Sequence, residues 1–414
     1  MKTDNLIITG ARIITPLGFK ARKGKEMNEL YDDVGTIEIT EGKITYVGAD
    51  RPSLPDGYKV IHAKGKVVLP GFVDSHTHLV FGGFRPDEFI WRLNGDTYMS
   101  ILQRGGGILS TVKATQETSA KLLRNKAEWF INTMSRMGVT TVEGKSGYGL
   151  DRDTELKQLE VMQAINFDPI RKVDIVTTFL GAHAVPTAYK GREEEYIDFL
   201  IKEMLPLVKR RMLAENCDVF CEDGVFTVEQ SRRLLKAAQE MGFGAKIHAD
   251  EIVSFGGAEL AGELHALSAD HLLHASDAGI HALADNNVVA TLLPLTAFTL
   301  HEPYARGREM IDSGCAVALA TDLNPGSCCS GSIPLTFALA CIYMHLTVAE
   351  AITALTLNGA AAVNRADTIG SIEVGKYGDV VLLDAETPNV LPYYTGMNTV
   401  ALTVKRGRIV SRRR

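Results

Sequence analysis

The stretch PGFVDSHTHLVFGGFR, residues 70–85, places two histidines two positions apart at the end of an apolar run. The apolar residues on both sides of the pair predict a buried strand. Since successive side chains on a strand point to opposite faces, His76 and His78 are expected to point the same way. One metal ion could then bind a nitrogen of each, at roughly 2.0–2.1 Å for zinc. Two buried or capping histidines are the alternative.

The predicted strand that holds this pair is the first of eight β-branched runs. The runs are VVLPGFVDSHTH (67–78), TTVEGKS (140–146), IVTTFLGAH (175–183), DVFCED (218–223), AKIHAD (245–250), SADHLL (268–273), VVATLLP (288–294) and AVALATD (316–322). Most of the gaps carry apolar residues three and four apart, which is typical of helices. Eight β/α units favour an α/β fold with a (β/α)8 TIM-type barrel over an open doubly wound sheet. No G-x-G-x-x-G follows a strand to indicate a dinucleotide site.

Both ends of the chain differ in texture from the middle. They contain short runs that alternate apolar and polar residues and are separated by glycine and proline. Neither end has enough strands to be stable alone. We therefore expect residues 1–65 and 366–414 to form one small composite β-sandwich domain, and residues 66–365 to form the barrel. The long connection 79–139 is expected to place an extra loop over the barrel mouth.

Composition and charge exclude several classes of protein. The chain has 44 basic and 50 acidic residues, a net charge of −6, which offers no basic surface for nucleic acid. No apolar run approaches the roughly 18 residues of a membrane span. The N-terminus alternates like a strand and does not resemble a signal peptide. The six cysteines form no C-x-x-C pair, as is usual in the cytosol. We expect a cytoplasmic protein that binds neither nucleic acid nor membrane.

Polar residues gather where the predicted strands end, and five of the eight runs end in histidine or aspartate. Catalytic groups of such barrels lie at the C-terminal ends of the strands. Packing alone explains the set poorly, because each buried polar group would need its own partner. The residues are His76, His78, Lys145, Tyr148, His183, His248, Glu251, His271, Asp322 and Asn324.

Four of these residues suit a metal ion. His76, His78 and His248 would supply three nitrogens, and Asp322 an oxygen. Such a set suits zinc or iron with a position left for water, whose pKa the ion would lower towards 7. The alternative for Asp322 is an N-cap in the TDLNPG turn.

The remaining polar residues suit proton transfer and substrate binding. His183 and His271 are free to move a proton or to polarise a substrate oxygen. Glu251, just past the fifth strand, could pass a proton to a leaving nitrogen. Arg85 could hold a carboxylate with both arms of its guanidinium, or could be a solvated loop charge. Tyr148 lies between glycines that let a ligand approach the backbone.

Taken together, these residues resemble those of a known family. The HTH segment with His248, His271 and Asp322 is similar to the amidohydrolase superfamily. The motifs HLVFGGFR, RGGGILSTV, KSGYGL, LGAHAVP, DVFCE, HADE and DLNPGS resemble, more specifically, the imidazolonepropionase family over nearly the whole chain. HTH alone is a weak signal, whereas KSGYGL, HADE and DLNPGS in this order are specific. The resemblance implies hydrolysis of 4-imidazolone-5-propanoate, a small molecule, to N-formimidoyl-L-glutamate in histidine degradation, by a homodimer.

The resemblance also implies roles for individual residues. One zinc or iron ion per chain would be bound by His76, His78, His248 and Asp322. Substrate contacts would come from Arg85, Tyr148, His183, Glu251 and Ser327, and product contacts from Asn324 and Gly326. Catalysis would use Glu251, His271, Asp322 and His183. Two-metal relatives carry a bridging lysine near the end of strand four, where this chain offers only Cys221, Glu222 and Asp223, so one metal is expected.

Several alternatives stay open at this point. Either Glu251 or His271 could be the first base, and three histidines with one aspartate serve zinc and iron alike. Cys328 and Cys329 lie near the expected site, but nothing places a base beside them. Another cyclic amidase or an aromatic deaminase of the same superfamily is the closest rival, and a non-catalytic barrel is a remote one. A base deaminase has no use for a carboxylate clamp, so Arg85 and Tyr148 favour the imidazolone.

Overall fold

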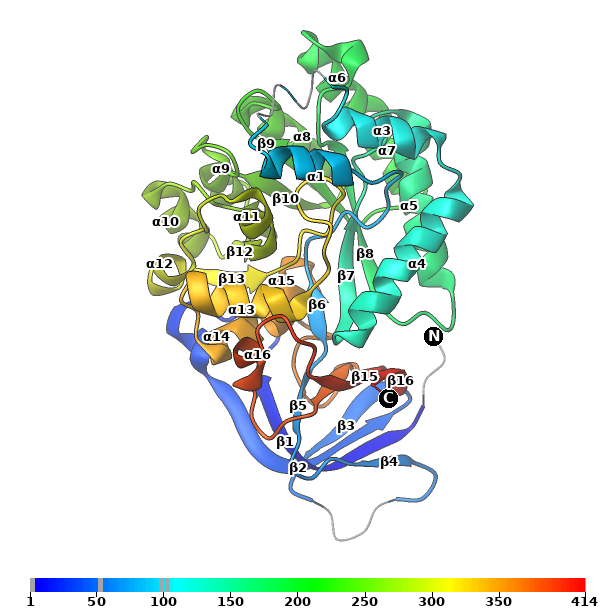
Figure 1. The fold of residues 1–414 in the computed structure, drawn as a ribbon, viewed down its shortest axis with the longest axis vertical. Coiled ribbons are helices and arrows are strands. Elements are labelled where there is room, and N and C mark those ends of the chain that lie inside the picture. Colours follow the sequence, from blue (N-terminus) through cyan, green and yellow to red (C-terminus); the bar gives the residue numbers. More distant parts are fainter. Residues whose placement is uncertain (1–3, 51–54, 97–99, 101–103, 414) are drawn as a thin grey trace.

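The computed structural model describes residues 4–50, 55–96, 100 and 104–413, and its strands form two eight-stranded sheets. One sheet is built from the middle of the chain and the other from both ends, as Figure 1 shows. The predicted fold class, a (β/α)8 barrel with a second unit made by the termini, is confirmed.

The barrel sheet is parallel throughout, and neighbouring strands in the sheet are consecutive along the chain. Each of the eight predicted runs contributes one strand to this sheet. The strands are β6 (Phe72–Asp74), β7 (Val139–Lys145), β8 (Asp174–Ala182), β9 (Asn216–Cys221), β10 (Gly244–Ala249), β11 (Ser268–His271), β12 (Val289–Leu292) and β13 (Ala316–Leu319). Nearly all their residues are buried, as expected of parallel strands covered by helices.

The first predicted strand is wrong in one respect, because the run 67–78 divides between the two sheets. β5 (Val67–Pro70) pairs with strands of the terminal sheet, and only β6 joins the barrel. β6 ends at Asp74, so His76 and His78 follow the strand and are not part of it. The physical reason is that the segment after Asp74 keeps only isolated backbone contacts with its two neighbours. The backbone N–H of Lys145 in β7 donates to the carbonyl of Thr77, and on the other side a single bridge joins Thr77 to Leu323, which follows β13.

The barrel closes at this segment. The backbone N–H of Asp322 donates to the carbonyl of His76 over 3.1 Å, and that of His78 donates to the carbonyl of Leu323 over 2.8 Å. A single parallel bridge joins Thr77 to Leu323. The Asp74 carboxylate accepts the backbone N–H and the hydroxyl of Thr321. Closure therefore brings two predicted metal-binding segments into direct contact.

Helices cover the outside of the barrel. Several begin at a serine, threonine or aspartate whose side chain accepts a backbone N–H of the first turn, which stabilises helix starts. The covering helices are α4 (Ala120–Arg136), α5 (Arg152–Phe167), η2 (Thr187–Tyr189), α6 (Glu193–Phe199), η3 (Leu200–Met204), α7 (Leu205–Arg210), α8 (Val228–Glu240), α9 (Gly257–Glu263), α10 (Asp277–Asp285), α11 (Pro294–Leu300), α12 (Gly307–Asp312), α13 (Ile333–Tyr343), α14 (Val348–Thr353), η4 (Ala354–Asn358) and α15 (Gly359–Ala362).

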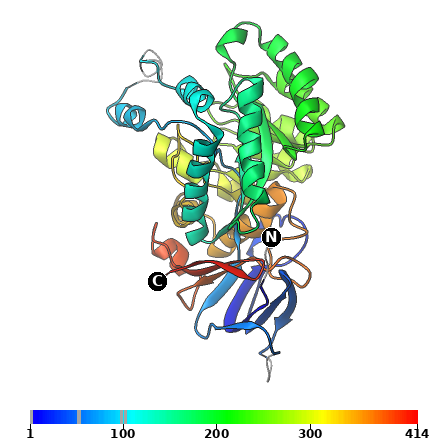
Figure 2. The same ribbon diagram turned by 90° about the vertical axis from the view of Figure 1, so that its right-hand side faces the viewer.

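The terminal sheet has the order β16-β15-β14-β5-β1-β2-β3, with β4 paired to β1. Strands from both ends share one apolar cluster that includes Ile8, Ile37, Val380 and Leu402. Figure 2 shows the sheet at one end of the barrel. Its strands are β1 (Leu6–Pro16), β2 (Leu30–Thr40), β3 (Lys43–Gly48), β4 (Lys59–His62), β5, β14 (Val380–Leu383), β15 (Val400–Lys405) and β16 (Arg408–Arg412), accompanied by η1 (Gly24–Asn28) and α16 (Val390–Tyr393). The division into residues 1–65 with 366–414 and 66–365 stays a prediction.

The connection 79–139 carries α1 (Pro86–Leu93) and α3 (Ile108–Glu117) at the end of the barrel away from the terminal sheet (Figure 1). Arg92 of α1 donates to the carbonyl of Gly326 over 2.9 Å, so α1 is bound to the loop that follows β13. Among the described residues, no helix is both long enough and apolar enough to cross a membrane.

Candidate active site and metal centre

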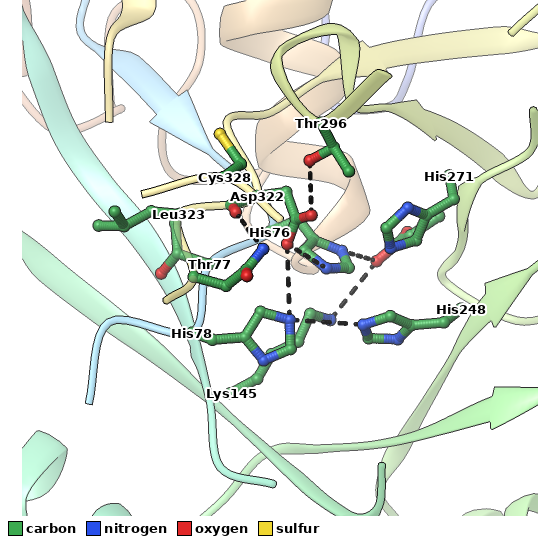
Figure 3. A network of polar contacts seen from close by, with 12 residues as sticks. His76, Thr77, His78, Lys145, His248, His271, Thr296, Asp322, Leu323 and Cys328 are labelled. Carbon is green, nitrogen blue, oxygen red and sulfur yellow. Dashed lines mark hydrogen bonds and ion pairs between the residues drawn. The ribbon is translucent and has the colours of Figure 1, made fainter. Parts of the chain in front are cut away.

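The four predicted metal ligands converge at the closure of the barrel. Asp322 Oδ1 lies 3.6 Å from His76 Nε2 and 3.7 Å from His78 Nε2. His248 Nε2, at the end of β10, lies 3.5 Å from His78 Nε2. All four side chains are buried, and Figure 3 shows the imidazoles and the carboxylate pointing toward one another.

This arrangement fits a metal ion. Donor atoms at roughly 2.0–2.1 Å from a tetrahedral zinc lie roughly 3.4 Å from one another, close to the separations found here. His76 Nε2 is buried and has no hydrogen-bond partner among the residues that the structure describes. Burial lowers the pKa of His76 and of His78 well below the usual range, so both rings stay neutral and keep a lone pair for an ion. Three imidazole nitrogens and one carboxylate suit zinc or iron.

Neighbouring polar groups orient three of these ligands. His76 Nδ1 is hydrogen-bonded to Asp270 Oδ2 over 2.6 Å, and His248 Nδ1 lies 3.0 Å from Asp218 Oδ2. Thr296 donates its hydroxyl to Asp322 Oδ2 over 2.6 Å, which leaves Oδ1 facing the histidines. A carboxylate on one ring nitrogen fixes the tautomer that presents the other nitrogen to a metal.

Glu251 and His271 lie beside the ligands and have opposite pKa shifts. Glu251 Oε1 is 3.6 Å from His271 Nδ1, and the His271 ring is 5.3 Å from that of His76 between centroids. Burial, with the charges of Asp322 and Glu222, raises the pKa of Glu251 to about 8. Burial lowers the pKa of His271 well below its usual range. At neutral pH the pair therefore offers a protonated carboxyl group beside a neutral imidazole.

His183 and Tyr148 form the wall next to His78. The His183 ring stacks on His78 with centroids 4.9 Å apart, and Tyr148 lies 5.2 Å from His183. The carbonyl of Gly147 is 3.1 Å from His183 Nδ1, so that nitrogen carries the proton and Nε2 is an acceptor. Burial lowers the pKa of His183 to about 3 and raises that of the Tyr148 hydroxyl, which keeps the imidazole neutral and the phenol protonated.

The loop that presents Tyr148 is fixed by Glu155. The Glu155 carboxylate is buried and accepts the backbone N–H groups of Gly147, Gly149 and Leu150 over 2.8–3.2 Å. Sequence reasoning missed this residue. Its signal was an acidic side chain in the first turn of the helix that follows KSGYGL.

Arg85 lies against the loop after β13. A Cβ atom on Gly326 would stand 1.6 Å from Arg85 Nη2, so only glycine leaves room for the guanidinium. Arg85 is mostly buried, with Nη1 3.5 Å from Glu88 Oε2. The Asn324 amide group donates to Asp322 O and Ser327 Oγ and accepts the N–H groups of Gly326 and Ser327. Its donors and its acceptor are therefore already used within the loop. Contacts from Asn324, Gly326 and Ser327 to a ligand stay predictions.

The residues at the end of β9 that were candidates for binding a second ion have other surroundings. Glu222 accepts the backbone N–H of Ile252 over 2.8 Å, and Cys221 is buried. Among the described residues, the histidine, cysteine and acidic groups close enough to share an ion do not include Cys221, Glu222 or Asp223. The expectation of one metal stays a prediction.

The thiols of the cysteines near the site are not activated. Cys328 is buried, Cys329 is exposed, and all six cysteines are free. Burial raises the pKa of the Cys328 thiol. This supports reading Cys328 and Cys329 as bystanders to the chemistry.

Sequence reasoning also missed the charged residues beneath the histidines. Lys145 was expected at the mouth, but it is fully buried among Glu143, Asp218, Lys246 and Asp270. The available signal was the alternation of charged residues in strands otherwise made of apolar ones, as in VEGK and AKIH.

Comparison with known proteins gives a consistent result. Residues 67–410 match the model of the amidohydrolase family. Three curated relatives are named imidazolonepropionase. The one from Phocaeicola vulgatus is 75% identical over 99% of both chains. The one from Bacteroides thetaiotaomicron is 67% identical over 98% of this chain and 99% of its own, and the one from Clostridium tetani 54% over 99% of both.

Solved structures resemble the chain in fold alone. A triazine hydrolase variant has a TM-score of 0.75 at 17% identity, covering 99% of this chain and 95% of its own. A 5-methylcytosine deaminase from Klebsiella pneumoniae has a TM-score of 0.74 at 18% identity, covering 99% and 98%. At such identities these structures support the barrel and its terminal sheet, and carry no argument about substrate.

Proposed function

The chain belongs to the amidohydrolase family, and from this membership and its relatives we infer that it is a hydrolase of a cyclic amide C–N bond, an imidazolonepropionase. It would convert 4-imidazolone-5-propanoate to N-formimidoyl-L-glutamate in histidine degradation. The observation that carries this function is the full-length similarity to curated imidazolonepropionases at 54–75% identity. The convergence of three histidines and an aspartate supports it.

One zinc or iron ion would be held by His76, His78, His248 and Asp322. When bound, it would supply the polarisation of the ring carbonyl and the acidity of a water molecule that amide hydrolysis needs at neutral pH. The neutral rings and the free Asp322 Oδ1 support this assignment.

The substrate would lie between α1 and the His183–Tyr148 wall. Arg85 would bind the propanoate carboxylate through both arms of its guanidinium, which is a geometry that arginine provides and lysine does not. Tyr148 would donate its hydroxyl, and His183 Nε2 would accept a ring N–H, because Nδ1 is already bonded to Gly147.

Glu251 and His271 would move the protons. The neutral His271 imidazole is suited to take a proton from the attacking water. Glu251, with a pKa of about 8, is suited to hold a proton at neutral pH and to pass it to the departing ring nitrogen. Pairs of titratable groups with opposite pKa shifts commonly divide acid and base roles in this way.

An aromatic deaminase is the second candidate, since a deaminase is among the proteins of similar fold. The position of Arg85 favours the imidazolone, because a nucleobase offers no carboxylate for it to bind. We further propose that the protein works in the cytoplasm as a homodimer, with residues 1–65 and 366–414 as one domain beside the barrel of residues 66–365.

The test is an assay with freshly generated 4-imidazolone-5-propanoate and detection of N-formimidoyl-L-glutamate, on protein whose zinc and iron have been quantified. We expect turnover with about one ion per chain, and Arg85→Ala should raise KM sharply. Arg104→Ala removes a half-exposed arginine paired with Asp96 and should leave KM unchanged. Fully metal-loaded protein that does not hydrolyse the imidazolone would refute the function.

A further inference from the structure

Five charged side chains are completely buried in the barrel beneath the predicted metal ligands. They are Glu143, Lys145, Asp218, Lys246 and Asp270, each with 0% exposure. Lys145 Nζ lies 2.6 Å from Asp218 Oδ2, 3.0 Å from Glu143 Oε2 and 3.4 Å from Asp270 Oδ2. One ammonium group therefore bridges three carboxylates contributed by three strands.

Two of these carboxylates also contact the metal ligands, through the same oxygen atoms. Asp270 Oδ2 bonds to His76 Nδ1 at 2.6 Å, and Asp218 Oδ2 lies 3.0 Å from His248 Nδ1. The Oδ1 atom of Asp218 accepts the Val219 backbone N–H instead. Lys145 is thus the common partner of the two oxygens that orient two imidazoles.

We propose that Lys145 is a positioning residue for the metal centre. Its ammonium group holds Asp218 and Asp270 against mutual repulsion, and these carboxylates hold the rings of His248 and His76 with Nε2 aimed at the ion. The proposal rests on the metal site of the proposed function. Lys145 acts through other residues and does not contact the substrate.

The charges of the cluster distinguish this role from simple pairing. Two ammonium groups and three carboxylates leave a net charge of −1. Lys246 Nζ lies 3.3 Å from Glu143 Oε2 and 3.6 Å from Asp270 Oδ2, and it also donates to the carbonyl of Ala362, so it is farther than Lys145 from both carboxylates. Buried ion pairs are weak contributors to stability compared with apolar packing. We attribute the position of these ion pairs to the contacts of Asp270 with His76 and of Asp218 with His248.

The test compares Lys145→Met with the double variant Lys145→Met/Glu143→Gln. The double variant removes one charge of each sign and keeps the net charge of the cluster at −1. The zinc Kd is measured by competition with a chelator, and the stability of the metal-free protein by urea unfolding. We expect the double variant to regain stability relative to Lys145→Met and still to bind zinc about 10- to 100-fold more weakly than the wild type, the usual effect of losing a group that orients a ligand.

Lys405 provides the matched control. It is also fully buried, with Nζ 2.7 Å from Asp379 and 2.8 Å from Asp174, at the terminal sheet. Lys405→Met/Asp379→Asn should lower stability and leave the zinc Kd unchanged. Asp218→Asn should weaken zinc binding as the Lys145 variants do, and it tests the same link if those variants do not fold.

Two outcomes are distinguished by this experiment. A double variant that binds zinc as tightly as the wild type, or a Lys405 control that loses as much affinity, would overturn the positioning role. A wild-type protein that binds no zinc would overturn the proposed metal site itself, and the inference with it.

Discussion

Gly326 offers a way to displace Arg85 without altering it. An alanine Cβ at this position would stand 1.6 Å from Arg85 Nη2, whereas unbonded carbon and nitrogen atoms pack at about 3.5 Å. The guanidinium must therefore move by roughly 2 Å. Gly326 is not in the left-handed region, so alanine fits the backbone itself.

A shift of that size takes the guanidinium out of hydrogen-bonding range of a bound carboxylate, since N–H···O bonds span about 2.7–3.2 Å. One hydrogen bond to a charged group contributes about 1.5–3 kcal/mol. We expect Gly326→Ala to lower kcat/KM for 4-imidazolone-5-propanoate by about 10- to 150-fold, mainly through KM.

Steady-state kinetics on four proteins tests this reasoning: wild type, Gly326→Ala, Arg85→Ala and the double variant. If alanine acts by displacing the guanidinium, it should have little further effect once Arg85 is gone. Equal losses in both backgrounds, or wild-type kinetics in Gly326→Ala, would refute the placement of Arg85. Gly331→Ala is the control, because the atoms nearest to its Cβ would belong to the Met134 side chain and not to Arg85.

Three further predictions concern the metal, a proton and a loop. Removal of the ion with a chelator should abolish hydrolysis and lower the free energy of unfolding by about 2.7 kcal/mol relative to protein with zinc at about 100 times its Kd, as measured by urea unfolding. The raised pKa of Glu251 predicts that kcat/KM falls as pH rises through about 8, where the carboxyl group loses its proton, and pH–rate profiles of Glu251→Gln should lack this limb. Glu155→Ala leaves three buried backbone N–H groups without their acceptor and should reduce the free energy of unfolding by about 3 kcal/mol, as measured by urea unfolding. Because Tyr148 lies in the same loop, the variant should also have a higher KM in steady-state kinetics.

The barrel strands could be predicted because parallel strands covered on both faces form short apolar runs. The change of sheet at Pro70 and Gly71 could not, because VVLP and FVD are equally apolar and only tertiary pairing separates them. The terminal sheet shows the same limit. Its alternation was visible in the sequence, but the pairing of β5 with β1 and β14 was not.

The metal ligands could be predicted because a barrel brings the ends of its strands together. The partners of those ligands depend on the register between strands. Asp218 precedes His248 by 30 positions, and no local pattern connects them before β9 and β10 are aligned. The product contact of Asn324 stays a prediction from the motif; the use of its amide in the turn of its own loop, as is common for asparagine, depends on the loop conformation.

The closure of the barrel gives the ion a mechanical role besides its chemical one. His76 and His78 follow the first barrel strand and Asp322 follows the last, so a bound cation would link the two strands at which the barrel closes. The full set of ligands does not exist until the eighth barrel strand has been synthesised. The free energy of cation binding then contributes to the free energy of folding, and the closed barrel is most stable with the cation bound.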